Sequence, residues 1–525
     1  MKNIQFIFLA SLAVLFSSCE TWLTETAPAV TGLEDYYTSG ETGIYTTNAA
    51  YVPLTWEYNY TYYSDFFIGD VMSDDALKGG QNTSDMADVY DMENFKTIAN
   101  NGYLLDFYRT QYMGIGRCNL GLREVPALIP NENMTAEVQQ RLLGELKFLR
   151  AMYYFRLVRV FGGVPLVDYV IESTTDWQQP RATVESVYNF IVSDLEDASE
   201  LLWEKSAYAP EELGRATKGA AQAMLLKVNL YIHDYTEAKR WGEAIISSNE
   251  YDLLPTYANN FSIDYENGLE SVFEVQYADD PTGDYGGSNG EGGSGYTRGT
   301  YSIILTRSRS SLLGGGWGFN KPTVNLYNEY ESNDPRRDAT ILNPTDDQIE
   351  NPEQEIYLGT RFLNKKTGFY DADGNPIELS HPSRGPLNRI DIRFADVLLM
   401  YAEACCETGD YTDAKNALER VRNRARQGQP DILPAFPDYN GYADNKADLV
   451  SAVRHERRVE LGMEGHRWYD LCRWGVAKQV MDAYKATESP EAQSHMAEFI
   501  AGKHELFPIP SKEIELNPME QNPMY

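Results

Sequence analysis

Apolar residues recur at helical spacing in two pairs of segments along this chain. One pair of stripes follows residues 221–232 and 238–245, and the other follows residues 394–405 and 414–421. Within each stripe the apolar side chains fall at i, i+3, i+4 and i+7, which is the pattern of an amphipathic helix. The residues are Ala221, Met224, Leu225, Val228, Ile232, Ala238, Trp241, Ile245, Phe394, Val397, Leu398, Tyr401, Ala402, Cys405, Ala414, Ala417, Leu418 and Val421.

Nearly identical turns join the two helices of each pair. Residues 234–239 read Asp-Tyr-Thr-Glu-Ala-Lys, and residues 410–415 read Asp-Tyr-Thr-Asp-Ala-Lys. A helix, a tight turn and a helix with Ala near its start form the tetratricopeptide pattern. Further helices are expected at about residues 104–125, 136–161, 184–203 and 446–485. The pattern therefore predicts a mainly α fold, with a helical scaffold over about residues 100–250 and 390–490.

Between the two repeat copies the character of the chain changes. Residues 250–390 are rich in Gly, Pro, Asn, Asp and Tyr, and residues 50–100 are similarly irregular. Short runs at residues 270–276 and 301–305 have the composition of strands. We predict a tetratricopeptide-like helical repeat scaffold with a long loop-rich insertion containing short strands. Because loops on a rigid scaffold commonly carry function, a ligand is expected in the two irregular regions.

The chain begins like an exported lipoprotein. A basic start precedes an apolar run over residues 6–16, and two serines stand directly before Cys19. The apolar run is shorter than the roughly 20 residues that span a bilayer. We expect residues 1–18 to be a signal peptide and Cys19 to carry a lipid, leaving a mature chain of residues 19–525. An ordinary signal peptide with an incidental cysteine is the alternative.

Composition narrows the classes of partner. The net charge is −33, from 78 acidic against 45 basic residues, which argues against nucleic acid as a ligand. Tyrosine is abundant, with 37 residues, and its half-polar ring suits both helix packing and partly wet binding surfaces. The four cysteines other than Cys19 suggest no disulfide framework.

Catalytic motifs are present only as fragments. Residues 290–295 match G-x-G-x-x-G and residues 286–290 match G-x-S-x-G, but both lie in a glycine-rich tract without the required strand and helix. His455 and Glu456 begin like a zinc-protease helix, but the second histidine is missing. We therefore expect a non-enzymatic protein without a metal or cofactor.

Two charged segments are also interpreted as structural. Residues 371–375 begin like a calcium loop, but Pro376 occupies the position that requires glycine, so a hairpin turn is expected. The charged residues between Arg457 and Arg473 are spaced for intrahelical ion pairs on a docked helix.

Blocks in the C-terminal part of the chain carry a family resemblance. They cover residues 396–404, 456–475, 506–510 and 517–525, and a further block covers residues 145–166. In this order they resemble the SusD/RagB family of surface nutrient-binding lipoproteins of Bacteroidetes-type bacteria. The resemblance covers nearly the whole mature chain, residues 19–525, and implies a single domain of this type.

The resemblance also implies a function. Family members bind a glycan at the cell surface, or sometimes a peptide, and act as a lid over a SusC-like TonB-dependent outer-membrane transporter. This chain is accordingly expected at the outer membrane, held by its lipid and facing the cell exterior. An oligopeptide-binding lid remains open, as does a surface glycoside hydrolase, which would need two carboxylates about 5–10 Å apart. A purely structural tetratricopeptide adaptor would need neither the aromatic loops nor the lipid.

Two segments combine aromatic rings with hydrogen-bonding side chains, as sugar recognition requires. The first begins at an acidic pair after which the family places ligand contacts. The second is the glycine-rich loop, where Trp317 stands between glycines that leave its ring face open. The ligand-binding residues we predict are Asp74, Lys78, Gln81, Asn82, Tyr90, Tyr285, Asn289, Tyr296, Arg298 and Trp317.

Overall fold

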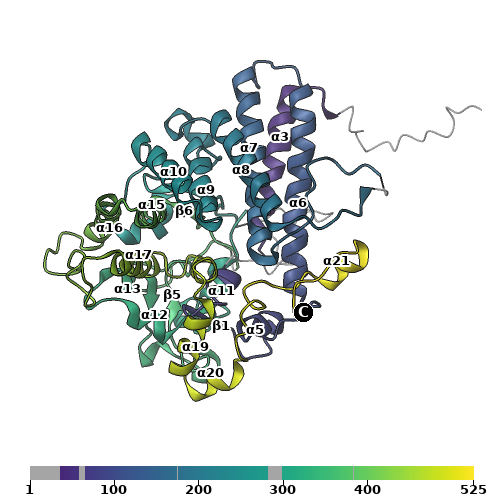
Figure 1. The fold of residues 1–525 in the computed structure, drawn as a ribbon. Helices are drawn as coiled ribbons and strands as arrows, with labels where there is room; N and C mark the ends of the chain where they lie inside the picture. The colour runs from purple at the N-terminus through teal and green to yellow at the C-terminus, as the bar shows by residue number, and fades with distance from the viewer. Residues whose placement is uncertain (1–35, 58–65, 174–175, 282–297, 382) are drawn as a thin grey trace, which may run out of the picture.

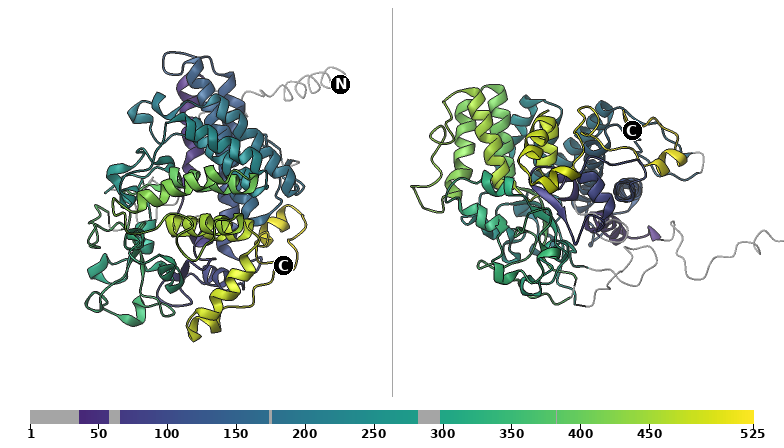
Figure 2. Two further views of the ribbon diagram at one scale, coloured as in Figure 1. Left: turned by 60° about the vertical axis from the view of Figure 1, so that its left-hand side comes forward. Right: turned by 90° about the horizontal axis from the view of Figure 1, so that it is seen from below.

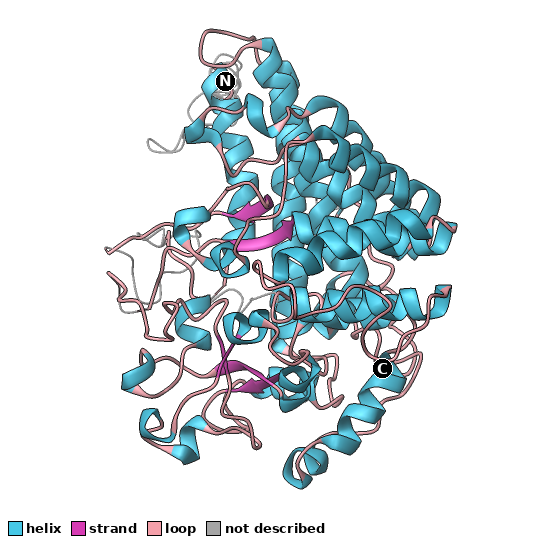
Figure 3. Ribbon diagram, turned by 90° about the vertical axis from the view of Figure 1, so that its left-hand side faces the viewer, coloured by secondary structure: helices cyan, strands magenta, loops and turns pink. Residues whose placement is uncertain are grey.

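The computed structural model describes residues 36–57, 66–173, 176–281, 298–381 and 383–525. Helices gather on one side of the molecule, and loops with short strand pairs gather on the other (Figure 3). The fold is therefore mainly helical with a loop-rich insertion, as predicted. The signal peptide and Cys19 lie outside the described residues. No helix in the described ranges combines the length and the apolar character needed to cross a membrane.

Four long helices stand side by side at one end of the scaffold (Figure 1). They are α3 (Gly40–Tyr51), α6 (Gly102–Glu124), α7 (Ala136–Phe161) and α8 (Val184–Leu201). The side chains of Thr135 and Thr183 accept backbone N–H groups in the first turns of α7 and α8, which fixes where these helices begin. Gly162, with φ of 72°, ends α7 in a conformation that favours glycine. The three helices predicted here are confirmed.

The two repeat copies stack on one another although the insertion separates them in the sequence. The helices are α9 (Lys218–Tyr231), α10 (Tyr235–Ser248), α15 (Phe394–Thr408) and α16 (Tyr411–Ala425). Helix α10 packs against α15, and Lys239 Nζ lies 2.6 Å from Asp410 Oδ2 (Figures 1 and 2). Gly242 allows this contact, because a Cβ there would lie 2.7 Å from the Tyr401 ring. The interrupted repeat is thus continuous in space.

The single long helix predicted over residues 446–485 is wrong. The segment forms α17 (Lys446–Leu461), α18 (Arg467–Arg473) and α19 (Ala477–Thr487). Gly465 and Gly475 separate them with φ of 77° and 67°, values that favour glycine and stop a right-handed helix. Helices α20 (Pro490–His495) and α21 (Ser511–Leu516) follow.

Short antiparallel strand pairs tie the insertion together. Strand β1 (Ala76–Gly79) pairs with β3 (Phe319–Pro322), β2 (Ser271–Val275) with β6 (Arg389–Arg393), and β4 (Ile341–Leu342) with β5 (Leu363–Asn364). The strand predicted at residues 270–276 is confirmed as β2. The remaining elements are α4 (Phe66–Gly69), α5 (Ala87–Glu93), α11 (Ser302–Thr306), α12 (Val324–Glu329), α13 (Pro335–Thr340), α14 (Pro352–Glu355) and 3₁₀ turns at Val52–Thr55, Val125–Ala127, Lys205–Ala207, Pro210–Glu212, Tyr257–Phe261, Ile263–Tyr265, Ser311–Leu313 and Asp346–Gln348.

The strand predicted at residues 301–305 is wrong, because this run forms helix α11. The Glu57 carboxylate accepts the Tyr301 N–H at 2.6 Å and the hydroxyls of Thr300 and Ser302 at 2.8 and 2.9 Å. A carboxylate at a helix start stabilises the unpaired N–H groups and the positive end of the helix dipole. The partner lies 244 residues away in the sequence, so local pattern gave no sign of it.

The charges of residues 457–473 hold different segments together more than they pair within one helix. Asp470 and Arg473 do form an i,i+3 pair at 2.9 Å. Glu460, however, accepts from Arg336 at 3.0 Å and from Arg393 at 2.6 Å, and all three side chains are buried. The expected structural role therefore holds, but the pairing partners come mainly from the insertion and from other helices.

Candidate functional site

The first predicted ligand-binding segment meets the Trp317 part of the second through the β1–β3 pair. Gly79 lies opposite Phe319, and the Gly80 N–H donates to the Gly318 carbonyl at 2.8 Å. A Cβ on Gly79 would lie 2.1 Å from that carbonyl oxygen, so only glycine permits this approach. We call residues 78–86 the first loop and residues 307–318 the second loop. They lie next to each other although more than 200 residues separate them in the sequence.

Asp74 is buried behind the first loop and is held by two arginines. Its side chain lies 2.8 Å from both Arg458 Nη2 and Arg467 Nε. Burial by itself raises the pKa of this carboxyl, but the two guanidinium groups lower it to about 2. The residue is 2% exposed, so its predicted ligand contact is replaced by a structural ion pair.

Lys78 is also enclosed, with 0% of its surface exposed. Its ammonium donates to the carbonyls of Gly79, Asn82 and Asp85 at 2.7, 3.1 and 2.6 Å. Three donors on three acceptors leave this group no hydrogen for a ligand. The structure therefore contradicts the expected ligand contact, and Lys78 instead shapes the first loop from inside.

Gln81 and Asn82 are exposed at the tip of the first loop. The Asn82 side-chain oxygen accepts the N–H groups of Ser84 and Asp85 at 2.9 and 3.2 Å, which folds the tip into an Asx turn. This bonding uses the oxygen of Asn82, whose side chain is exposed. The two amides are thus placed where a ligand hydroxyl can reach them, and their predicted contact with ligand stays a prediction.

Tyr90 lies in α5, directly after the first loop, and is half-buried. Its hydroxyl lies 2.5 Å from His495 Nδ1, and Lys96 Nζ lies 5.8 Å from its ring centroid. The hydroxyl therefore joins α5 to α20, and the ring remains the part of Tyr90 that a ligand could contact.

Trp317 is half-buried in the second loop, with part of its ring packed against the core. Its ring centroid lies 5.7 Å from that of Tyr301, and its backbone N–H donates to the Ile304 carbonyl at 2.8 Å. At Gly316 a Cβ would lie 2.5 Å from the Arg307 side chain, and Gly318 has φ of 72°. The glycines therefore permit the tight path of the loop, and the Trp317 ring is half-buried, not fully open as predicted.

The glycine-rich segment before the second loop is described only at its end. Arg298 is exposed, and its carbonyl accepts the Ala278 N–H at 2.8 Å. Tyr285, Asn289 and Tyr296 lie outside the described residues.

The second loop is anchored by residues that the sequence analysis did not single out. Glu350 accepts the Ser311 N–H at 2.5 Å and the Ser310 hydroxyl at 3.1 Å. Arg309 reaches across to Asp85 of the first loop at 2.8 Å. These are single residues outside any motif, so no pattern in the sequence marks them.

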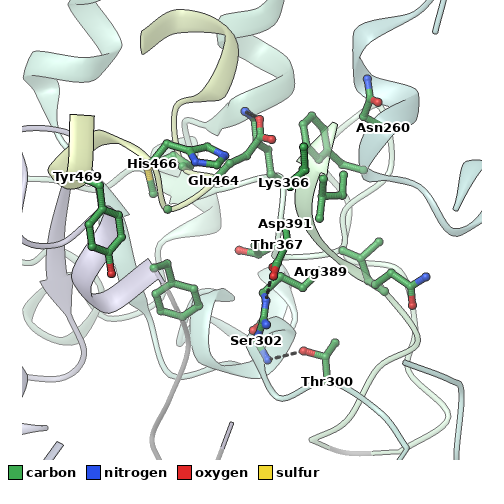
Figure 4. A pocket seen from close by; sticks show the side chains of 18 of the residues that line it. Asn260, Thr300, Ser302, Lys366, Thr367, Arg389, Asp391, Glu464, His466 and Tyr469 are labelled. Carbon is green, nitrogen blue, oxygen red and sulfur yellow. Dashed lines mark hydrogen bonds and ion pairs between the residues drawn. The ribbon is translucent and has the colours of Figure 1, made fainter. Parts of the chain in front are cut away.

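An internal cavity of about 120 Å³ lies between the helical scaffold and the insertion (Figure 4). Most of its charged side chains are already paired, for example Asp391 with Arg389 at 3.1 Å and Lys366 with Glu464 at 2.6 Å. Burial lowers the pKa of His466 to about 4, so the imidazole that lines the cavity is uncharged at neutral pH. The exposed loops are the better candidate site.

Comparison with known proteins identifies the class. The SusD family model matches residues 269–525, and a model described as starch-binding associating with outer membrane matches residues 37–230. The chain belongs to the SusD family, as the C-terminal blocks predicted.

Individual relatives cover most of the chain at modest identity. SusD-like protein P2 of Formosa agariphila is 26% identical over 472 residues, 84% of this chain and 86% of that protein. Starch-binding protein SusD of Bacteroides thetaiotaomicron is 24% identical over 456 residues, covering 75% and 74%. A solved laminarin-binding SusD-like protein superposes with a TM-score of 0.78 at 27% identity, covering 93% of this chain and 100% of that one. Surface glycan-binding protein A of Bacteroides thetaiotaomicron, solved with laminarihexaose, gives 0.76 at 25%, covering 92% and 100%.

Proposed function

We propose that this chain binds an oligo- or polysaccharide at the face formed by the first and second loops. The observation that carries the proposal is the β1–β3 pair, which sets the exposed amides of Gln81 and Asn82 beside the loop that holds Trp317. Amide donors and an aromatic ring match the hydroxyls and the apolar faces of a sugar. The laminarin-binding and starch-binding relatives support this ligand class. Binding is non-covalent, and no reaction follows.

The proposal extends to the setting of the protein. A lipid on Cys19 anchors the chain at the outer membrane, facing the cell exterior. A SusC-like TonB-dependent transporter receives the glycan, with this protein acting as its lid. The stacked helices of the repeat array offer the extended contact surface that such a partner needs.

A binding experiment with paired tryptophan variants tests the proposal. The purified protein is titrated with neutral glycans, including laminarin and starch, and with a peptide library, and the glycan is checked for cleavage products. Trp317→Ala should weaken glycan binding about tenfold, or about 1.4 kcal/mol, by removing an aromatic platform. Trp177→Ala is the matched control, because Trp177 is 64% exposed on the connection between α7 and α8, away from both loops.

Each outcome has a distinct meaning. Saturable glycan binding that Trp317→Ala weakens and Trp177→Ala does not supports the proposal. Binding to peptides alone would instead favour the alternative function of an oligopeptide-binding lid. Released oligosaccharide products would replace it with a hydrolase.

A further inference from the structure

The basic side chains at the root of both loops are bound to backbone carbonyls. The Lys78 ammonium donates hydrogen bonds to three carbonyls of the first loop. Arg307, only 3% exposed, donates through Nε and Nη2 to the carbonyls of Gly368, Phe369 and Ile377 at 2.8, 2.8 and 2.6 Å. Neither charge is presented to a ligand on the surface. These residues shape the loops but do not recognise an anion.

The third basic side chain, Arg309, is neutralised at the surface by Asp85. Arg309 Nη2 lies 2.8 Å from Asp85 Oδ2, and the two side chains are 22% and 32% exposed. The same carboxylate oxygen accepts the Gln81 N–H at 2.9 Å, which fixes its position. Within the two loops, which the structure describes throughout, each lysine and arginine is therefore already engaged.

Two exposed carboxylates border this face. Glu350 caps the second loop, and Asp88 is exposed directly after the first. Arg298, which precedes the second loop, is exposed. Sulfated or uronic-acid chains repeat a negative charge along their length, and like charges set against each other at an interface oppose binding.

We infer that the site takes an uncharged glycan and that Asp85 sets this preference by neutralising Arg309. This inference rests on the proposed function and names the class of its ligand. A carboxylate beside a guanidinium removes the group that would otherwise bind sulfate or carboxylate in a bidentate pair. Hydroxyl groups of a neutral sugar need no such cation, and the exposed amides of the first loop suffice.

Matched pairs of glycans test the inference. Affinities are measured for laminarin and starch, and for sulfated laminarin, alginate and polygalacturonate, at low and at high salt. We expect each anionic chain to bind at least about tenfold more weakly than the neutral glycan that binds best. The affinity for the neutral glycan should change little with salt, because ionic screening acts on charged contacts.

Three variants assign the preference to Asp85. Asp85→Asn keeps an oxygen for the Gln81 N–H but releases Arg309, so the ratio of anionic to neutral affinity should rise about fivefold or more. Adding Arg309→Gln to Asp85→Asn should return this ratio to that of the wild type. Asp413→Asn, which removes an exposed carboxylate on helix α16 of the repeat, should leave the ratio unchanged and so controls for net charge.

The possible results distinguish a failure of this inference from a failure of the proposed glycan binding. Equal or tighter binding of an anionic chain by the wild type would overturn the inference while leaving glycan binding intact. An unchanged ratio in Asp85→Asn would overturn the role of Asp85. Binding to none of the glycans would remove the proposed function itself.

Discussion

Asp74→Asn distinguishes a structural role for the acidic pair from a role in ligand contact. The Asp74 carboxylate lies 2.8 Å from Arg458 and from Arg467, with its side chain 4% exposed. Asparagine keeps the shape but removes the charge, leaving both guanidinium groups with less compensation. The carboxyl pKa falls from 3.8 to about 2 in the folded protein, which corresponds to about 2–3 kcal/mol of stability at neutral pH.

The direction of the pH dependence follows from this depressed pKa. The stabilisation is present above the unfolded pKa of about 4 and is lost as the pH falls through 2. The difference in unfolding free energy between wild type and variant should therefore be full at pH 7 and shrink in acid. Breaking a buried ion pair costs up to about 3–5 kcal/mol. In Asp74→Asn, however, Arg458 would still have Asp75 at 2.8 Å, so we expect the loss of about 2–3 kcal/mol.

Urea unfolding followed by tryptophan fluorescence measures this loss. Asp373→Asn serves as the matched control and should change stability by less than about 0.5 kcal/mol, because Asp373 is exposed. If Asp74→Asn had wild-type stability but had lost glycan affinity, Asp74 would act on the ligand and not on the fold.

Two further predictions concern the scaffold. Burial alone lowers the pKa of His455, but its hydrogen bond to Glu329 at 2.7 Å helps raise this pKa to about 9. The protonated imidazole therefore stabilises the fold fully below pH 6.5, and this stabilisation is lost as the pH rises through 9. His455→Gln should lower the free energy of unfolding by roughly 3 kcal/mol at pH 6. It should also flatten the decline of this free energy at higher pH, and a parallel decline in wild type and variant would contradict this. Gly69→Ala should destabilise by at least about 3 kcal/mol, because its Cβ would lie 2.0 Å from the Gly465 carbonyl oxygen. Gly116→Ala, where a Cβ meets nothing within 4 Å, should be neutral or stabilising; equal melting temperatures for the two glycine variants would contradict this.

The repeat scaffold was predictable because its information is local. Apolar periodicity and the Asp-Tyr-Thr turns located the helix pairs of the repeat, and helix starts such as Thr135 and Thr183 agree with the predicted bounds. The failures occurred where a distant residue decides the local structure. A short apolar run after Thr300 has no intrinsic preference between strand and helix, and the Glu57 carboxylate decides it.

The candidate site was predictable as a pair of segments but not as a set of contacts. The sequence identified the regions around Asn82 and Trp317 through composition and family resemblance. It could not show that Asp74 and Lys78 point inward, because exposure depends on the fold around them. Nor could it pair Asp85 with Arg309, since ion pairs between distant segments leave no spacing pattern.

A crystal structure of the protein with a bound neutral oligosaccharide would locate the glycan-binding face. We predict a sugar ring against the half-buried Trp317 side chain, with hydroxyl oxygens about 2.7–3.2 Å from the side-chain amides of Gln81 and Asn82. A sugar bound in the internal cavity beside His466, or on the repeat helices away from β1 and β3, would contradict the account.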